Sequence, residues 1–331
     1  VQPEVADDMS LRVEDLRVYY QTLEGEVKAL DGVSFAIADG EIMGLAGESG
    51  CGKSTLAQSI VRLVPPMKLV GGVVELDGEK LPIDDFEAMN RHRMVGVSIV
   101  PQYAMSALNP TRKIGKLIKE LLGARGISYR AKLPELENRL QLVGLPREVL
   151  DMYPIELSGG MKQRVVMVIS TLLDPSLLIA DEITSALDVS TQRAVAEMLV
   201  DFRDREIVKS MMVVTHDVSI LYQIADSILI MYAGQPVESG PAEVITHAPR
   251  HPYTQLLVGS LPQVGVRYDE QPLSGIAGNP PGLIDPPSGC RFRPRCPFAS
   301  ERCESRPPLV EIGDGHSVAC WKVMEEEDAR V

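Results

Sequence analysis

The sequence predicts an α/β fold organised around a phosphate-binding loop and followed by a small, loop-rich segment. Three observations carry this prediction. Strand-like apolar runs alternate with helical patterns along most of the 331 residues. A glycine-rich loop of the GxxxxGKS type occupies Gly47–Ser54, after an apolar strand and before a helix. Proline and glycine become dense between residues 261 and 308, where loops are expected.

The order of the elements supports a layered arrangement of strands and helices. A helical pattern at Leu56–Leu63 follows the glycine loop, which completes a strand, loop and helix unit. From about residue 105 to residue 166 the pattern is mostly helical, with candidate helices at Lys116–Leu122 and Pro134–Val143, and we expect a helical insertion there. The predicted strands are Leu11–Tyr20, Val33–Ala38, Ile42–Ala46, Gly72–Leu76, Gly96–Val100, Leu177–Ala180, Met211–Thr215 and Ile228–Tyr232.

Composition argues against several classes of protein. The formal net charge of −13 gives no broad electrostatic footprint for nucleic acid. The most apolar stretch, Val165–Ala180, is interrupted by Asp174 and Pro175, so no apolar run is long enough to cross a bilayer. The first eight residues are acidic and have no apolar core, so we expect no signal peptide and a cytoplasmic chain.

The glycine loop predicts a nucleotide site. Its glycines would let the backbone approach the phosphates, Lys53 would reach the β- and γ-phosphates, and the Ser54 hydroxyl would coordinate Mg²⁺. A chance match is a weak alternative because the loop lies between a strand and a helix, which is the context that such a loop requires. The expected nucleotide-binding residues of this region are Gly47, Glu48, Ser49, Gly50, Cys51, Gly52, Lys53, Ser54 and Thr55.

Two acidic residues follow the apolar strand Leu177–Ala180. Asp181 would emerge at the carboxyl edge of the sheet, where open α/β sheets bind ligands, and would hold Mg²⁺. Glu182 would stand beside the attacking water as a general base, an effect worth roughly 10²- to 10⁴-fold. Taken alone, an acidic pair after a strand is more often a solvated turn. Together with the phosphate loop, it favours catalysis.

A second glycine motif begins another predicted helix. Residues 157–163 read LeuSerGlyGlyMetLysGln, ahead of a helix expected at residues 161–173. Ser158, Gly159 and Gly160 would turn a hydroxyl and backbone amides toward an anion, because helix N-termini attract negative charge. The phosphate loop of the same chain is not expected to supply that anion.

The ordered set of these motifs resembles the ATPase subunit of an ABC transporter. The set comprises Gly47–Ser54, Gln102, Leu157–Gln163, Asp181-Glu182, Asp188 and His216. The resemblance implies a RecA-like core with an antiparallel β subdomain and a helical subdomain. It also implies two subunits packed head to tail, each nucleotide lying between one phosphate loop and the other subunit's SerGlyGly motif.

The resemblance also implies individual roles. Gln102 would contact Mg²⁺ and water, and His216 would contact the γ-phosphate, although a lone histidine at a strand end is more often structural. Tyr20 would stack on adenine, with Tyr19 as the competing choice because strand alternation points only one of them at the nucleotide. Asp188 is expected at the subunit interface. Ile183 departs from the family, which usually has proline after the catalytic glutamate; no catalytic group is lost by this change.

Four of the five cysteines lie close together near the C-terminus. Cys290, Cys296, Cys303 and Cys320 are separated by gaps of five, six and sixteen residues, whereas Cys51 lies in the phosphate loop. Disulfides are disfavoured because the ATPase motifs indicate a reducing compartment. Zinc sites usually show short CxxC spacings, whereas widely spaced thiolates also ligate iron–sulfur clusters, so spacing leaves the metal open.

The tail carries a second resemblance. Residues 289–299, together with Cys303 and residues 316–320, resemble the C-terminal extension of ATPases in the oligopeptide, dipeptide and nickel importer family, some of which carry a [4Fe–4S] cluster. That resemblance implies an iron–sulfur cluster on the four clustered cysteines. A metal-free loop module is the alternative, and His316 is expected to be structural rather than a ligand.

The expected organisation follows from both resemblances. A tail at residues 1–10 would precede an ATPase domain at 11–260, and a cysteine-bearing extension would fill 261–331. The chain would bind ATP and Mg²⁺ and power import of a peptide-like or other small solute. Its expected partners are a second ATPase subunit, identical or different, two permease subunits and an extracytoplasmic substrate-binding protein, at the cytoplasmic face of the membrane. The alternative is a soluble ABC ATPase without a transport role.

Overall fold

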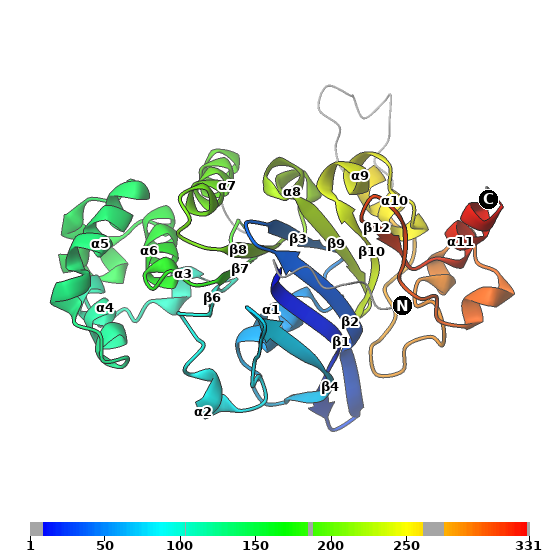
Figure 1. The fold of residues 1–331 in the computed structure, drawn as a ribbon, viewed down its shortest axis with the longest axis horizontal. Helices are drawn as coiled ribbons and strands as arrows, with labels where there is room; N and C mark the ends of the chain where they lie inside the picture. The colour runs from blue at the N-terminus through cyan, green and yellow to red at the C-terminus, as the bar shows by residue number, and fades with distance from the viewer. Residues whose placement is uncertain (1–8, 103, 185–187, 261–274, 330–331) are drawn as a thin grey trace.

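The computed structural model describes residues 9–102, 104–184, 188–260 and 275–329. The first eight residues of the expected N-terminal tail and residues 261–274 of the expected extension lie outside these ranges. A helical part, a central pair of sheets and a C-terminal segment follow one another along the longest axis (Figure 1). We use the name C-terminal segment for residues 275–329.

The central sheet has eight strands in the order β11-β12-β10-β9-β3-β8-β7-β6. The run from β9 to β6 is parallel, whereas β10, β12 and β11 are added antiparallel at one edge. Every residue of β3, β7 and β8 is buried, as expected for parallel strands covered on both faces. The strands are β3 (Ile42–Ala46), β6 (Val97–Val100), β7 (Leu177–Asp181), β8 (Ser210–Val214), β9 (Ser227–Tyr232), β10 (Gln235–Pro241), β11 (Val310–Gly313) and β12 (His316–Val318).

A smaller antiparallel sheet covers one face of the central sheet. Its order is β2-β1-β4-β5, formed by β1 (Met9–Thr22), β2 (Gly25–Ala38), β4 (Met67–Leu76) and β5 (Glu79–Lys80). Apolar side chains such as Leu11, Val18 and Ile37 pack in one core with Leu45 of β3 and Met212 of β8. This burial fixes the antiparallel sheet beside the strand that leads into the phosphate loop.

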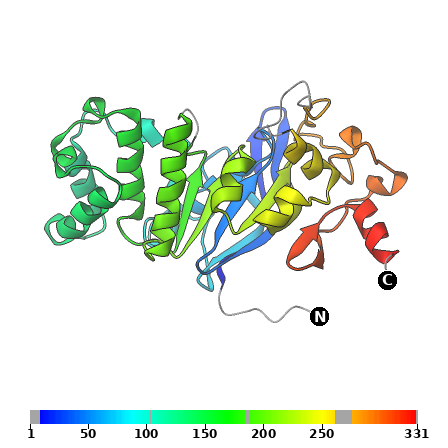
Figure 2. The same cartoon turned by 90° about the horizontal axis from the view of Figure 1, so that it is seen from above.

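The other face and one end are covered by helices (Figure 2). Helix α4 shows why such a segment folds: Ile114, Ile118 and Leu122 recur at helical spacing and are all buried. Between β6 and β7 the described residues form helices and turns without a strand, as predicted. The longer helices are α1 (Lys53–Val61), α4 (Ile114–Gly123), α5 (Tyr129–Leu142), α6 (Gly159–Thr171), α7 (Val189–Asp204), α8 (Val218–Ile224), α9 (Ala242–His247), α10 (Pro252–Gly259) and α11 (Trp321–Asp328). Shorter ones are α2 (Phe86–Met89), α3 (Ala104–Ala107) and the 3₁₀ turns η1 (Arg147–Asp151), η2 (Pro154–Glu156), η3 (Arg293–Arg295) and η4 (Glu301–Glu304).

Most predicted elements are confirmed, with shifted ends. The strand expected at Ile42–Ala46 is found as predicted. The helix expected at residues 161–173 begins at Gly159 instead, because the Ser158 side chain accepts a hydrogen bond from the Met161 amide and caps the helix there. Strand β10 was not predicted, since its sequence contains two prolines and a glycine.

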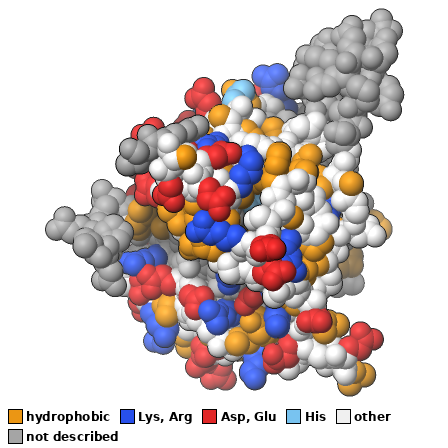
Figure 3. All heavy atoms as spheres, turned by 90° about the vertical axis from the view of Figure 1, so that its right-hand side faces the viewer, with side chains coloured by type: hydrophobic (Ala, Val, Ile, Leu, Met, Phe, Trp, Pro, Cys, Tyr) orange, Lys and Arg blue, Asp and Glu red, His pale blue; other side chains and the backbone are white. Residues whose placement is uncertain are grey.

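The C-terminal segment continues the central sheet. Glu238 and Ser239 of β10 pair with Val318 and Ser317 of β12, although about 80 residues separate them in sequence. Acidic and basic side chains are interspersed on the face that carries this segment (Figure 3). Among the described helices, none is both long and apolar enough to cross a membrane.

Candidate nucleotide-binding site

The phosphate loop joins β3 to α1 and wraps around the Lys53 side chain. The Lys53 ammonium is buried and donates to the carbonyl oxygens of Gly47, at 2.7 Å, and Glu48, at 3.0 Å. Glycine is required in this loop: a Cβ at Gly47 would lie 2.2 Å from the Met231 carbonyl oxygen, and φ there is +146°. The loop therefore has the tight backbone that a phosphate cradle needs.

Ser54 and Asp181 lie together at the mouth of the loop. The Ser54 hydroxyl donates to the Asp181 carboxylate at 3.1 Å. Burial raises the pKa of Asp181 to about 6, and the Ser54 hydrogen bond opposes that shift. A hydroxyl and a carboxylate at this spacing offer the hard oxygen ligands that Mg²⁺ prefers.

Gln102, Glu182 and His216 meet beyond the carboxyl ends of three adjacent parallel strands. The Gln102 side-chain amide, after β6, donates to the Glu182 carboxylate at 2.6 Å. The Glu182 carboxylate, after β7, lies 3.9 Å from Nδ1 of His216, after β8. Glu182 adopts a positive φ of 47°, and its amide donates to the Val214 carbonyl. The strand order thus brings together three residues that lie far apart in the sequence.

The two candidate tyrosines point in opposite directions, as strand alternation requires. The Tyr19 hydroxyl donates to the Asp31 carboxylate at 2.9 Å, and only 9% of Tyr19 is exposed. The Tyr20 hydroxyl lies 3.1 Å from the Thr55 hydroxyl, at the start of α1. Tyr20 is therefore the one placed beside the phosphate-loop helix.

The second glycine motif lies at the exposed N-terminus of α6. Ser158 is exposed, and Gly159 and Gly160 form the first turn. The Gln163 side chain, one turn on, donates to the Ile183 carbonyl and so links α6 to the loop after Glu182. Asp188 caps α7 by accepting from the Thr191 amide at 3.0 Å; the residues between it and Thr184 lie outside the described parts.

The four clustered cysteines line one small cavity in the C-terminal segment. Cys290, Cys296, Cys303 and Cys320 all contribute to its wall, and all five cysteines of the chain are free thiols. Burial raises the pKa of Cys290 to about 11, and it also raises the pKa values of Cys296 and Cys320. In the described parts of the chain, no three His, Cys, Asp or Glu side chains are grouped so as to hold a metal ion.

His316 lies elsewhere, in a structural role. Its Nε2 is 2.8 Å from the buried carboxylate of Glu238, on β10. That carboxylate also accepts from the amides of Arg250 and His251. Glu238 therefore ties β10, β12 and the start of α10 together, and this network was not predicted from the sequence.

Glu48 is placed differently from the other residues of its loop. Its side chain points toward Arg295 of the C-terminal segment and accepts two hydrogen bonds from it. Sequence reasoning gave no indication of this contact, since 247 residues separate the two.

Two family models match the sequence. The model described as ABC transporter matches residues 30–185, and the model described as oligopeptide/dipeptide transporter, C-terminal region, matches residues 237–303. A dimeric bacterial ABC transporter cassette shares the fold, with a TM-score of 0.62 and 24% identity over 70% of this chain and 98% of that one.

Curated relatives extend over nearly the whole chain. The dipeptide transport ATP-binding protein DppD of Caldanaerobacter subterraneus subsp. tengcongensis is 38% identical over 320 residues, which cover 96% of this chain and 97% of that protein. The oligopeptide transport ATP-binding protein OppD of Escherichia coli K12 is 37% identical over 322 residues, covering 96% and 95%. With the motifs gathered at one sheet edge and these relatives matched end to end, the chain belongs to the oligopeptide and dipeptide branch of the ABC transporter ATP-binding subunits.

Proposed function

We propose that the chain binds and hydrolyses ATP to power the import of a peptide-like or other small solute through partner permease subunits. One observation carries the enzymatic part: Lys53, Ser54, Gln102, Asp181, Glu182 and His216 gather at the carboxyl edge of the central sheet. The names of the relatives, which are dipeptide and oligopeptide transport ATP-binding proteins, support the choice of solute class.

The phosphate loop and its neighbours would hold MgATP. Lys53 and the loop amides would bind the phosphates, and Ser54 with Asp181 would hold the Mg²⁺ that neutralises their charge. Tyr20 would stack on the adenine. Ser158, Gly159 and Gly160 of a second subunit would close the site from the opposite side, since their own helix N-terminus is exposed and suited to an anion.

Hydrolysis would be an in-line attack of water on the γ-phosphorus. The Glu182 carboxylate would accept the proton as the oxygen–phosphorus bond forms, and the bond to the β-phosphate oxygen would break to release ADP and phosphate. Gln102 holds the Glu182 carboxylate at 2.6 Å and would fix its direction. His216, 3.9 Å from the same carboxylate, would contact the γ-phosphate.

The expected partners follow from this role. A second ATPase subunit, two permeases and an extracytoplasmic substrate-binding protein would complete the importer, with this chain on the cytoplasmic face of the membrane.

Reconstitution tests the proposal. The chain is purified with the permeases and second ATPase encoded beside it, placed in vesicles, and assayed for ATP-dependent uptake of short peptides. The Lys53→Ala complex, which lacks the ammonium in the phosphate loop, is the matched control. ATPase activity that the permeases do not stimulate, together with no uptake, would favour a soluble ABC ATPase instead.

We further propose that the cysteine-lined cavity holds an iron–sulfur cluster. Support comes from the four free thiols that line this cavity. Burial raises the pKa values of Cys290, Cys296 and Cys320, so binding of a metal would have to release their protons. When bound, such a group supplies one-electron chemistry or a rigid crosslink.

Anaerobic purification decides this second proposal. We expect about four irons per chain, and we expect a brown colour that Cys296→Ser removes. Cys51→Ser, which changes a thiol outside the cavity, should keep the colour. Zinc in place of iron, or a chain without metal, would refute the cluster.

A further inference from the structure

A buried ion pair joins the C-terminal segment to the phosphate loop. Two nitrogens of the Arg295 guanidinium donate to the two carboxylate oxygens of Glu48, at 2.6 and 3.0 Å. Only 5% of the Arg295 side chain and 24% of the Glu48 side chain are exposed. A contact with two parallel hydrogen bonds, largely shielded from water, is stronger than a single exposed arginine–carboxylate contact.

Every donor of Arg295 is used. The same guanidinium donates to the Tyr232 hydroxyl at 3.1 Å and to the carbonyl oxygens of Ile276 at 3.1 Å and Ala277 at 2.8 Å. Because a guanidinium has five N–H groups and all five have acceptors here, the side chain has one orientation. Arg295 therefore holds the Glu48 carboxylate in one position.

The backbone of Glu48 makes hydrogen bonds at the centre of the phosphate loop. Its amide donates to the Tyr253 hydroxyl at 2.8 Å, and its carbonyl accepts from the Lys53 ammonium at 3.0 Å. The residue that receives Arg295 through its side chain therefore touches, through its backbone, the lysine expected to bind the phosphates.

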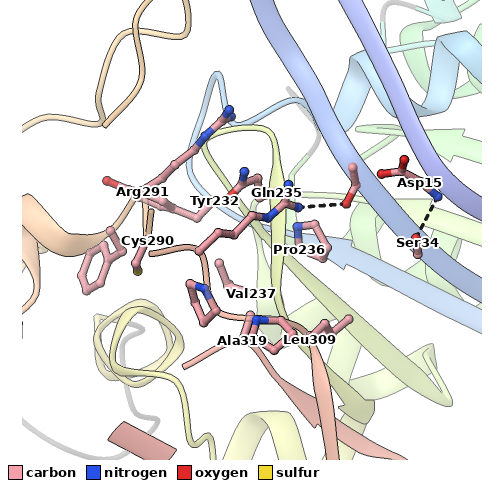
Figure 4. A pocket seen from close by; sticks show the side chains of 15 residues that line it. Asp15, Ser34, Tyr232, Gln235, Pro236, Val237, Cys290, Arg291, Leu309 and Ala319 are labelled. Carbon is pink, nitrogen blue, oxygen red and sulfur yellow. Dashed lines mark hydrogen bonds between the residues drawn. The ribbon is translucent and has the colours of Figure 1, made fainter. Parts of the chain in front are cut away.

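The part of the C-terminal segment that carries Arg295 is itself packed firmly against the core. Phe292, three residues before Arg295, is fully buried and packs at 5.2 Å from the Tyr232 ring and 5.3 Å from the Tyr253 ring. Arg291 follows Cys290 in the C-terminal segment and lines a pocket beside Tyr232 (Figure 4). It adds a second contact with the core by donating to Asp31 of β2 and to the Ala233 carbonyl. The next residue, Gly234, donates its amide to Cys51 of the phosphate loop at 2.8 Å.

Charge gives the contact a further consequence. Glu48 is an anion in a loop that has to accept the anionic phosphates of a nucleotide, and like charges repel strongly where water is excluded. Arg295 neutralises this carboxylate and holds it on the side of the loop that faces the C-terminal segment. Without Arg295, an unpaired carboxylate would be left beside the phosphate site.

We propose that Arg295 is a positioning residue for nucleotide binding, through which the C-terminal segment holds the phosphate loop in its binding shape and neutralises Glu48. This inference rests on the proposed ATP-binding function. It assigns to the C-terminal segment a direct part in ATP affinity.

Affinity for ATP in the absence of Mg²⁺, measured by calorimetry on the full chain, tests the inference without hydrolysis. Arg295→Gln should weaken ATP binding by on the order of tenfold, the range expected for losing a charged hydrogen-bonded pair. Adding Glu48→Gln to that variant should restore affinity to within about threefold of the parent, because the uncompensated charge is then gone. Arg302→Gln, which removes an exposed arginine of the same segment paired with Glu325, should bind ATP like the parent.

The outcomes distinguish a failure of the proposed ATP binding from a failure of the role assigned to Arg295. A parent chain that does not bind ATP refutes the proposed function. A parent that binds, with a folded Arg295→Gln variant of equal affinity or with no rescue by Glu48→Gln, refutes the role of Arg295 alone. If Arg295→Gln does not fold, Arg295→Lys replaces it: this variant keeps the charge but loses the fork, and should show a smaller loss of affinity that Glu48→Gln again reverses. No loss or no rescue in that pair overturns the inference.

Discussion

The Gln102 side-chain amide donates to the Glu182 carboxylate with 2.6 Å between nitrogen and oxygen, across the ends of the neighbouring strands β6 and β7. Glu182 also stands at a positive φ, in which a non-glycine residue is held only by its surroundings. Two hydrogen bonds supply that restraint: one from the Glu182 backbone amide to the Val214 carbonyl, and one from the Gln102 side chain to the Glu182 carboxylate. The carboxylate is thus held in one direction at the place where β7 ends.

Replacing this carboxylate should separate ATP binding from hydrolysis. Glu182→Gln keeps the size of the side chain and loses the proton acceptor, so we expect ATP to be retained and turnover to fall by at least about 10²-fold. A closed, ATP-bound dimer should accumulate, which size-exclusion chromatography in the presence of ATP detects. Turnover at the parent rate would show that Glu182 is not the base.

A substitution in the SerGlyGly motif should separate ATP binding by one subunit from ATP hydrolysis by the assembled pair. Gly160→Asp should fold normally, because the atom nearest to a new Cβ is 4.0 Å away on Thr191. ATP binding by the single subunit should persist, whereas ATPase activity of the assembled pair should fall by at least about 10²-fold, since a carboxylate would stand where a phosphate is expected.

Gly123→Asp is the matched control for that variant. Gly123 ends α4 with open space around its Cβ position, and the same charge there should leave ATPase activity within about twofold of the parent. Equal losses in both variants would mean that Gly160 has no special part in the reaction.

The sequence predicted most of this arrangement because its signals are local. The loop at Gly47–Ser54 and the strand ending at Asp181 each carry their own pattern, and parallel strands bring their carboxyl ends together without further information. The contact between Glu48 and Arg295 has no such signal. It depends on how a proline-rich, loop-forming segment folds back over 247 residues, which periodicity does not encode.

Strand β10, near one edge of the central sheet, was not predicted for a related reason. β10 reads GlnProValGluSerGlyPro, with no alternation of apolar and polar residues, and becomes a strand because β9 and β12 pair with it on either side. The buried Glu238 in this strand would be costly alone, and only the distant His316 and the amides of Arg250 and His251 make its burial tolerable.

Removing the aromatic anchor of the C-terminal segment should destabilise the protein strongly. Phe292 is 1% exposed, so Phe292→Ala should cost about 3–5 kcal/mol in the free energy of unfolding of this segment. The single tryptophan, Trp321, lies in the same segment and reports its release by fluorescence during urea unfolding. Phe298→Ala, which changes a ring that is 50% exposed, should cost less than about 1 kcal/mol. Equal costs would mean that Phe292 does not anchor the segment.

His251 should make the protein sensitive to acid. Its side chain is buried, its Nδ1 accepts from the Tyr253 amide at the start of α10, and burial lowers its pKa to about 4 while Glu238 opposes the shift. In the unfolded chain the ordinary pKa is about 6.5, so between these values the unfolded state binds a proton that the folded state refuses. Stability from this group is therefore complete above pH 6.5 and is lost as the pH falls toward 4.

His251→Asn isolates that contribution, because asparagine can still cap α10 but does not titrate. Between pH 6.5 and 4.5 its free energy of unfolding should fall by about 2 kcal/mol less than that of the parent. The same carboxyl groups are present in both proteins, and His247→Asn, which removes an exposed histidine, is the matched control. Urea unfolding at a series of pH values gives all three slopes, and equal slopes for the parent and His251→Asn would show that His251 takes up its proton as readily in the folded chain as in the unfolded one.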